Sequence, residues 1–295
     1  FLFGPSPFVY AEMVELPRTG QTKSYVAGDD GALQTGVAWP SPRFQVVYGK
    51  RGARCPNQTS DCDADSSTDA VIDRLTGLMW ARNGSLAKKG KAWAESVSFA
   101  GSLDLCGYSD WRLANANELE SLVNVRAKDT SAFLETQGFA DMEPQYYWTS
   151  TSVASFSQFA WVVHLAAGMV FFSGKTGGNL PFLAVRGKTS LPAKVRRTGQ
   201  STSRTDGDDG DLKAGIPWPS PRFTVIYCDK GKRCEEQGAD CDGNAATDMV
   251  LDNLTGLLWA RSANLKGDSV PWSGALDFAN GLNLCGSSDW RLPNR

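Results

Sequence analysis

The sequence contains a single histidine, His164, and few of the motifs that mark enzymes. One histidine excludes metal centres built from several imidazoles. No serine lies in the Gly-x-Ser-x-Gly pattern that is typical of one large class of hydrolases. Glycine loops of the Walker or Rossmann type, which bind phosphates, are also missing. We therefore expect that the protein is not an enzyme.

Long hydrophobic runs and an excess of charge of one sign are missing too. A membrane-spanning helix needs about 20 consecutive apolar residues, whereas the longest run here, residues 159–172, is interrupted by His164 and Gly168. The 30 basic and 32 acidic residues leave a formal net charge of −2, which does not favour attraction to nucleic acid or to anionic lipid. We expect neither a membrane span nor a nucleic-acid partner, and no pattern indicates the oligomeric state.

The sequence does contain a long tandem repeat. Each landmark between Arg18 and Leu113 recurs 179 positions later, so that Arg18 corresponds to Arg197 and Leu113 to Leu292. A constant offset of this length predicts tandem domains rather than a solenoid. We assign residues 15–187 to the first domain, 188–193 to a linker and 194–295 to a second domain, which is incomplete because Arg295 corresponds to Ala116.

The start of the chain indicates export. Residues 1–14 combine an apolar run, helix-breaking glycine and proline, and small residues where a signal peptidase would cut, so we interpret them as a signal-peptide remnant with a short lead-in. A short apolar strand is the alternative. We expect a secreted or cell-surface location, with the chain being a fragment of a longer secreted protein.

Cysteine spacing supports export. Cys55 and Cys62, with Cys234 and Cys241 at the corresponding positions, are spaced to close small disulfide loops. A zinc site is the alternative, but no histidine lies near to complete a ligand set. The third cysteine of each repeat, Cys106 or Cys285, is then expected to be a buried free thiol or to pair outside its repeat. A seventh, Cys228, stands where the first repeat has glycine.

Hydrophobic periodicity predicts an α+β domain. Residues 44–48 alternate as a strand does, and residues 71–80 fit a hairpin whose turn contains Gly77. Residues 92–103 have the apolar spacing of an amphipathic helix, and Asn115 is placed to cap a second one. Short strands are predicted over residues 146–151, 159–165, 169–173 and 182–186. The prediction is a loop-rich fold with two helices and small antiparallel sheets.

Several motifs in fixed order resemble one known family. They are Thr-Gly-Gln, Gly-Asp-Asp-Gly, Trp-Pro-Ser-Pro-Arg-Phe, Leu-Thr-Gly-Leu-Met-Trp, Ser-Asp-Trp-Arg-Leu and Tyr-Trp-Thr-Ser-Thr. In this order they resemble the Lcl C-terminal domain family, long catalogued as a domain of unknown function. The resemblance implies a secreted or surface bacterial protein, and the best-known relative is an adhesin that binds sulfated glycosaminoglycans. Residues 290–294 are also similar to formylglycine-generating-enzyme-like domains, which implies a C-type-lectin-like fold. Ala114, where the second repeat has Pro293, and the negative net charge depart from these patterns.

Two features are candidate sites. Oxygen ligands at alternating positions of a turn-rich loop are typical of Ca²⁺ binding. The candidate calcium ligands are Asp61, Asp63, Asp65 and Asp69, and in the second repeat Asp240, Asp242, Asn244 and Asp248. The bidentate glutamate of an EF-hand is replaced by Ile72 and Leu251, and solvated turns are the alternative interpretation.

The other candidate is a tryptophan beside an arginine, at Trp111–Arg112 and Trp290–Arg291, which can bind a carbohydrate or an anion. A structural clamp within the core is the alternative.

These observations favour a bacterial binding or adhesion module in tandem array, which recognises a glycan or another extracellular polymer, or a surface protein. Tandem copies raise avidity without strong single sites. A structural spacer or assembly repeat without a small ligand is the first alternative, and an enzyme on a lectin-like fold is the second. The second alternative would need a cleft centred on His164 or Cys106.

Overall fold

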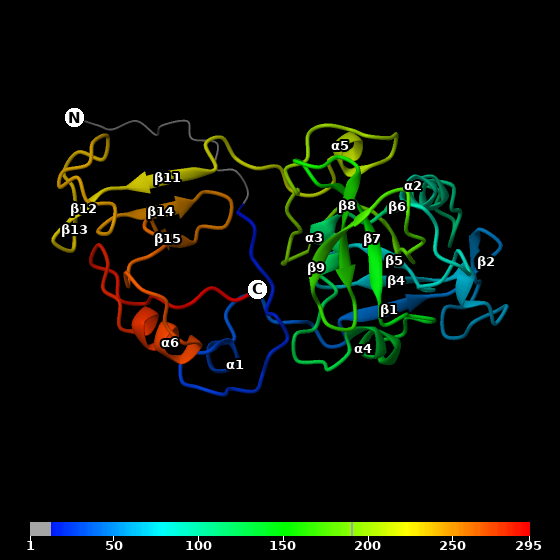
Figure 1. The fold of residues 1–295 in the computed structure, drawn as a ribbon. Helices are drawn as coiled ribbons and strands as arrows, with labels where there is room; N and C mark the ends of the chain where they lie inside the picture. Colours follow the sequence, from blue (N-terminus) through cyan, green and yellow to red (C-terminus); the bar gives the residue numbers. More distant parts are fainter. Residues whose placement is uncertain (1–12, 190) are drawn as a thin grey trace, which may run out of the picture. The chain divides into compact units, whose positions relative to one another are not determined.

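The computed structural model describes residues 13–189 and 191–295 (Figure 1). Most of the predicted signal-peptide remnant, residues 1–14, therefore lies outside the described residues. The chain forms two compact units. One contains residues 16–21 and 36–217, and we call it the first-repeat unit. The other contains, among the described residues, 13–15, 22–35 and 218–295, and we call it the second-repeat unit. The compact units therefore differ from the sequence repeats at residues 22–35, which belong to the first repeat but pack with the second.

The first-repeat unit is built on two antiparallel sheets. The larger has the order β1-β4-β5-β10-β6, formed by β1 (Phe44–Val47), β4 (Ala70–Asp73), β5 (Met79–Ala81), β10 (Ala184–Arg186) and β6 (Arg112–Leu113). The smaller has the order β7-β8-β9, formed by β7 (Tyr146–Ser152), β8 (Phe159–His164) and β9 (Val170–Gly174). A short ribbon joins β2 (Gly49–Lys50) to β3 (Ala53–Arg54). The helices are α2 (Trp93–Gly101), α3 (Ala116–Glu120), α4 (Thr130–Thr136), α5 (Asp209–Leu212) and the 3-10 turn Ser66–Thr68.

The hairpin between β4 and β5 shows how local sequence builds this sheet. Gly77 has a φ of 79°, which a glycine adopts without strain. Asp73, at the end of β4, accepts a hydrogen bond from the Thr76 hydroxyl and pairs with Arg43 at 2.8 Å. Both members of that ion pair are buried, so each satisfies the charge of the other in a place that water does not reach.

Tryptophans hold α2 against the smaller sheet. The indole N–H of Trp93, at the start of α2, donates to the backbone oxygen of Thr149 in β7. The indole N–H of Trp148, also in β7, donates to the backbone oxygen of Lys91. Both side chains are at most 2% exposed. A buried indole needs a partner for its N–H, so these two bonds fix the position of α2 on the sheet.

The second-repeat unit reproduces the first part of this fold. Its sheet has the order β11-β14-β15, and it contains β11 (Phe223–Ile226), β14 (Met249–Asp252), β15 (Leu258–Ala260), the ribbon β12 (Cys228–Asp229) with β13 (Lys232–Arg233), and the helices α1 (Asp30–Leu33) and α6 (Trp272–Asn280). The pairing matches that of β1, β4 and β5. The predicted mixture of helices and small antiparallel sheets in a loop-rich chain is therefore confirmed. The short helix α4 was not predicted.

The cysteines follow the prediction in part. The structure contains both loop disulfides, Cys55–Cys62 and Cys234–Cys241, and Cys106 is free and buried. Cys285 instead pairs with Cys228 inside its own repeat, so the expectation of a free thiol or an external partner was wrong for it. The first repeat lacks this bond because it has Gly49 at the position of Cys228. A Cβ atom at Gly49 would lie 2.9 Å from the Cys106 sulfur.

Within residues 13–189 and 191–295, none of the helices has the length and apolar character needed to cross a membrane.

Candidate functional site

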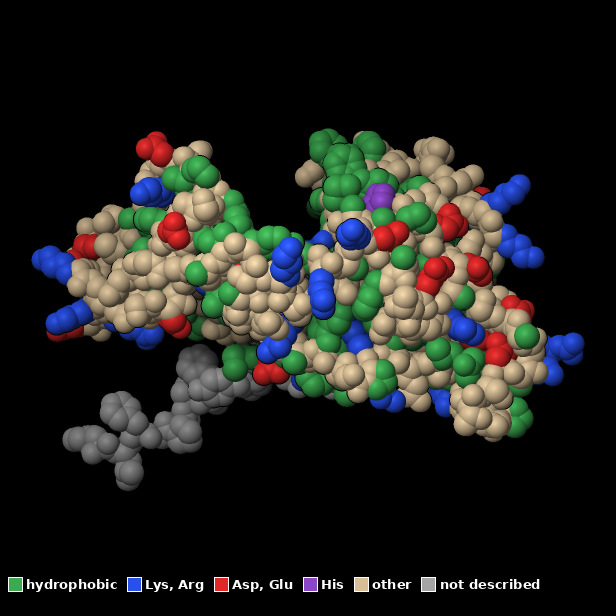
Figure 2. All heavy atoms as spheres, turned by 90° about the horizontal axis from the view of Figure 1, so that it is seen from below, with side chains coloured by type: hydrophobic (Ala, Val, Ile, Leu, Met, Phe, Trp, Pro, Cys, Tyr) green, Lys and Arg blue, Asp and Glu red, His purple; other side chains and the backbone are tan. Residues whose placement is uncertain are grey.

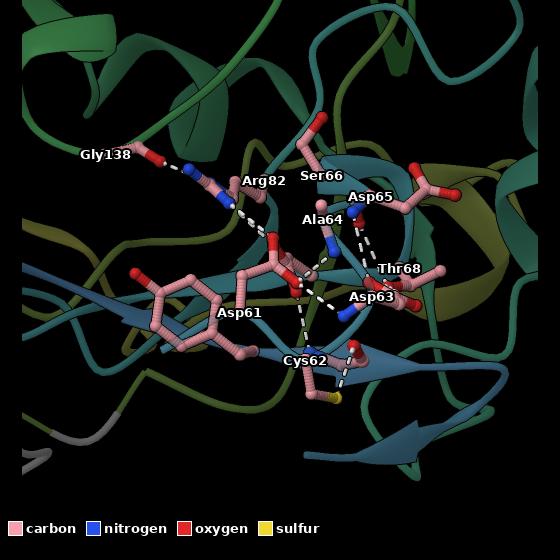
Figure 3. Close-up of polar contacts among 12 residues, drawn as sticks. Asp61, Cys62, Asp63, Ala64, Asp65, Ser66, Thr68, Arg82 and Gly138 are labelled. Atoms are coloured by element: carbon pink, nitrogen blue, oxygen red, sulfur yellow. Dashed lines mark hydrogen bonds and ion pairs between the residues drawn. The ribbon is translucent and has the colours of Figure 1, made fainter. Parts of the chain in front are cut away.

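The first acidic loop folds on itself through its own carboxylates (Figure 3). Asp61 accepts the backbone N–H groups of Asp63 and Ala64 at 3.1 and 2.8 Å. Asp63 accepts that of Asp65, and Asp65 accepts that of Ser67. These are successive turns closed by aspartate side chains. The hydrogen bond from the Asp63 backbone is the largest of the effects that lower the pKa of Asp61.

An arginine joins the two ends of this loop. Arg82 lies 2.6 Å from the carboxylate of Asp69 and 3.7 Å from that of Asp61. It also donates to the backbone oxygen of Gly138, as Figure 3 shows. Asp69 is 1% exposed and accepts the N–H of Gly49; burial raises its pKa. The guanidinium thus supplies the positive charge that the buried carboxylate requires.

The second acidic loop repeats this arrangement more tightly. Oxygen atoms of Asp240, Asp242 and Asp248 all lie within 4.8 Å of one another. Arg261 contacts Asp248 at 2.6 Å and Asp240 at 3.3 Å. Asn244 caps the same turn by accepting the N–H of Ala246. The structure therefore brings together three of the four predicted ligands here, but a calcium ion would have to compete with Arg261 for two of them.

The Trp–Arg candidate lies in the core in the first repeat. Trp111 is 3% exposed, and its indole N–H donates to the backbone oxygen of Tyr108. Arg112 makes two hydrogen bonds of 2.6 Å to the carboxylate of Glu118. Glu118 also closes the capping box that begins α3 at Asn115. This geometry is that of a clamp between β6 and α3, and it leaves little of Trp111 exposed to a ligand.

In the second repeat, the Trp290–Arg291 pair has a tryptophan that is less buried than Trp111. Trp290 is partly buried and donates to the backbone oxygen of Ser287. Arg291 donates to the backbone oxygen of Leu292.

A cleft that the sequence analysis missed lies on the first-repeat unit. It has a volume of about 610 Å³. Its lining residues are Ala92, Trp93, Ala94, Glu95, Ser157, Lys175, Thr176, Arg204 and Thr205. The start of α2 forms one wall, the turn after β9 forms another, and the lead-in of the second repeat forms a third. The cleft is thus lined by residues of both repeats, all within one compact unit.

Two positive side chains line this cleft, and one of them packs on the buried indole of Trp93. The amino group of Lys175 lies 3.7 Å from the centroid of the Trp93 ring and donates to the Ser152 hydroxyl at 2.6 Å. Burial, with a smaller contribution from the charge of the exposed Arg204, lowers the pKa of Lys175 to about 8, against the opposing effect of Asp208. Lys175 is therefore still mostly protonated near pH 7, and it would gain from a negative charge placed in the cleft.

Sequence reasoning missed the cleft because its parts are unremarkable separately. Lys175 stands in a glycine-rich turn, and Arg204 stands in a part of the lead-in where the two repeats differ at most positions. The replacement of Tyr25 by Arg204 is therefore one of several changes there and gave no separate signal. Only the packing of that lead-in on the first-repeat unit brings the two cations near each other.

Comparisons with known proteins identify the chain. The family model of the Lcl C-terminal domain matches residues 69–186 and 248–295. Searches of curated proteins and of solved structures found no match. The two matched segments begin at corresponding positions of the repeat, and together they cover more than half of the chain. The chain therefore belongs to the Lcl C-terminal domain family and carries two copies of the domain, the second incomplete.

Proposed function

We propose that the protein is an exported bacterial binding module of C-type-lectin-like architecture. In this proposal the cleft beside Trp93 binds an anionic, hydroxyl-rich extracellular polymer, such as a sulfated glycan. The single observation that carries the proposal is the contact of Lys175 with the Trp93 ring, next to Arg204, at the wall of a cleft. Adhesion to such a polymer is the biological role that this site fits.

The chemistry of the cleft supports an anionic ligand. A guanidinium binds sulfate or carboxylate in a planar, two-bond geometry, and an ammonium adds a compact charge. Lys175 is already held by the Trp93 ring and Ser152, so little side-chain freedom is lost when a ligand binds. Glu95 and Thr205 add a carboxylate and a hydroxyl that can contact sugar hydroxyl groups.

The charges on the rest of the surface indicate that an anionic polymer would be attracted by the cleft and not by the protein as a whole. Figure 2 shows acidic and basic side chains interspersed over the face in view, without a broad field of one sign. A net charge of −2 would not draw a polyanion from a distance. Binding would then depend on short-range contacts in the cleft. Three disulfides are compatible with export, because such bonds persist in oxidising compartments.

The test is binding of the full chain to immobilised heparin and to an uncharged polysaccharide at about 0.15 M salt. The variants are Lys175→Gln and Arg204→Gln. Charge-assisted hydrogen bonds contribute about 1.5–3 kcal/mol each, so each variant should bind heparin roughly 10- to 100-fold more weakly.

The matched control is Lys128→Gln, which removes an exposed positive charge that does not line the cleft. It should bind like the unchanged protein. The proposal would be contradicted if all three variants lost heparin affinity equally. It would also be contradicted if neither matrix retained the unchanged protein. Equal binding to the uncharged matrix would show that the anionic groups do not matter.

A second function, an assembly repeat or spacer, is favoured by a different feature. Strand β9 is the edge of the smaller sheet, and its residues Val170, Phe171 and Phe172 are 37%, 55% and 41% exposed. An exposed apolar edge strand is a surface on which other chains can pair. If Phe171→Lys alters self-association while heparin binding is unchanged, the two functions coexist on separate surfaces.

A further inference from the structure

The lead-in of the second repeat contains a loop that is closed at its base and packs in the first-repeat unit. Backbone hydrogen bonds of 3.0 and 2.9 Å join Ile216 to Arg197 and to Val195. We call residues 201–214, which lie between these closing segments, the second arm. The second arm belongs to the first-repeat unit and supplies Arg204 to the wall of the cleft.

A buried aspartate fixes Arg204 within the second arm. The carboxylate of Asp208, which is fully buried, accepts the backbone N–H of Arg204 at 2.8 Å and that of Asp211 at 3.0 Å. The bond from Asp211 caps α5, because a helix leaves its first N–H groups without a partner inside the helix. The backbone of Arg204 is thus attached to the first turn of α5, so its position follows the position of that helix.

The next residue holds α5 on the body of the first repeat. Asp209 is 3% exposed and accepts a hydrogen bond from the Thr151 hydroxyl of β7 at 2.8 Å. At the other end of the arm, the side-chain amide of Asn115 donates to the backbone oxygen of Ala214 at 3.2 Å. Figure 1 shows α5 beside β7. The contact between Thr151 and Asp209 therefore sets where α5 lies, and with it the arginine that α5 holds at the cleft.

The first repeat shows which part of the arm is scaffold. Its residues 22–35, the first arm, contain the same Gly-Asp-Asp-Gly turn. Asp29 accepts the backbone N–H of Tyr25 at 2.6 Å and begins α1. Tyr25 stands where the second arm has Arg204. The same scaffold therefore presents a different side chain in each repeat.

We propose that the cleft is assembled from two consecutive repeats, with Asp209 as the positioning residue that holds Arg204 at it. This inference rests on the proposed function, because it concerns the same binding site. Lys175 comes from the body and Arg204 from the arm, so a ligand that contacts both binds only while the arm is docked. The measured affinity is then proportional to the fraction of molecules with a docked arm. By linkage, the ligand in turn stabilises the docked arm.

Heparin binding by the full chain tests this proposal. Asp209→Ala removes the carboxylate that accepts the Thr151 hydroxyl, so the arm should be docked in only a minority of molecules. Heparin affinity should fall about three- to tenfold, which corresponds to a docked fraction of about one third to one tenth. The matched control is Asp30→Ala, which makes the same change at the corresponding position of the first arm. It should bind like the unchanged protein, because the first arm does not line the cleft.

A double-mutant cycle separates positioning from a general loss of stability. If Asp209 acts through Arg204, adding Asp209→Ala to Arg204→Gln should lower the affinity by less than about twofold more. The charge-neutral variant Thr151→Val should lower the affinity in the same direction, with the same dependence on Arg204. Its matched control is Thr76→Val, which removes another threonine hydroxyl that donates to a buried aspartate, in the β4–β5 turn. This control should keep the affinity of the unchanged protein.

Hydrogen exchange of the unchanged protein gives a readout that depends on no variant. Heparin that contacts both Lys175 and Arg204 should slow the exchange of amides in residues 201–214 severalfold, because it stabilises the docked arm. Unaltered exchange in the arm, at a heparin concentration that saturates the protein, would overturn the proposal.

The binding results separate this inference from the proposed function. The inference alone is overturned if Arg204→Gln weakens heparin binding while Asp209→Ala and Thr151→Val do not. It is also overturned if the losses from Asp209→Ala and Arg204→Gln multiply in the double variant. If neither Lys175→Gln nor Arg204→Gln weakens binding, the proposed function fails and this inference fails with it.

Discussion

The two repeats have nearly the same local structure and very different cores. Trp80 in β5 is fully buried, whereas Trp259 at the corresponding position in β15 is 42% exposed. Trp93 is 2% exposed, whereas the corresponding Trp272 is 56% exposed. In the first repeat, β10 pairs with β5, and residues 117–186 supply most of the cover. The same hairpins and helices thus occur in both repeats, although the corresponding tryptophans differ in burial.

The comparison separates two sources of stability. Hairpin β4–β5 and hairpin β14–β15 have the same register and the same aspartate-capped turn, and the residues that make these contacts lie within each hairpin. Burial of the tryptophans, by contrast, comes from residues far along the chain.

Alanine at the two corresponding tryptophans should have very different effects. Trp80→Ala leaves a large hole in a packed core and should destabilise the first-repeat unit by about 3–5 kcal/mol. Trp259→Ala removes a side chain that is already half in water, so the loss should be about 1 kcal/mol. Denaturant unfolding, followed by hydrogen exchange in each unit, measures both. Equal losses would mean that the second repeat has a buried core after all.

The disulfides should matter more in the second repeat. Cys228–Cys285 joins residues 57 apart, and removing it with serine should cost about 4 kcal/mol by the loop-closure model. Cys55–Cys62 spans only 7 positions, so its removal should cost about 2.5 kcal/mol. Unfolding curves of the two double-serine variants give the comparison. A larger loss for the short loop would show that loop closure is not the main contribution.

Between pH 7 and pH 9, heparin binding should depend on pH through the titration of Lys175 in the first repeat. The pKa of Lys175 is lowered to about 8, so its positive charge is present below that pH and is lost as the pH rises through it. Heparin affinity should therefore fall severalfold between pH 7 and pH 9. The Lys175→Gln variant should lose this dependence. A fall of the same size in that variant would assign the titration to another group.

Calcium should have the smallest effect, and it should act mainly on the second repeat. Three carboxylates converge within 4.8 Å there, and a site with a Kd of about 1 mM would add about 1.4 kcal/mol of stability at 10 mM Ca²⁺. Thermal melting with calcium and with chelator measures the shift, and Asp242→Asn should abolish it. Arg261→Gln should enlarge it, because the competing cation is removed. Identical melting temperatures under all conditions would rule out the calcium site.

Much of the fold was predictable from particular residues. The alternation at residues 44–48, Gly77 in the hairpin and the capping residue Asn115 each indicated the element that forms there. The short helix α4 was missed, although Asp129 caps it through the N–H groups of Ser131 and Ala132. The candidate site was harder to predict. A tryptophan beside an arginine, as at Trp111 and Arg112, looks the same in sequence whether the pair binds a ligand or holds the core together.

By itself, the sequence determined the tandem organisation, the hairpins, the caps and the two loop disulfides, because each depends on residues close together in the chain. Only the tertiary structure decided that Cys228 pairs with Cys285, that Lys175 and Arg204 share a cleft, and that residues 22–35 pack in the second-repeat unit while residues 201–214 pack in the first-repeat unit. These features join segments that are distant in sequence. Their contacts depend on how whole units pack, and no local pattern of residues encodes that.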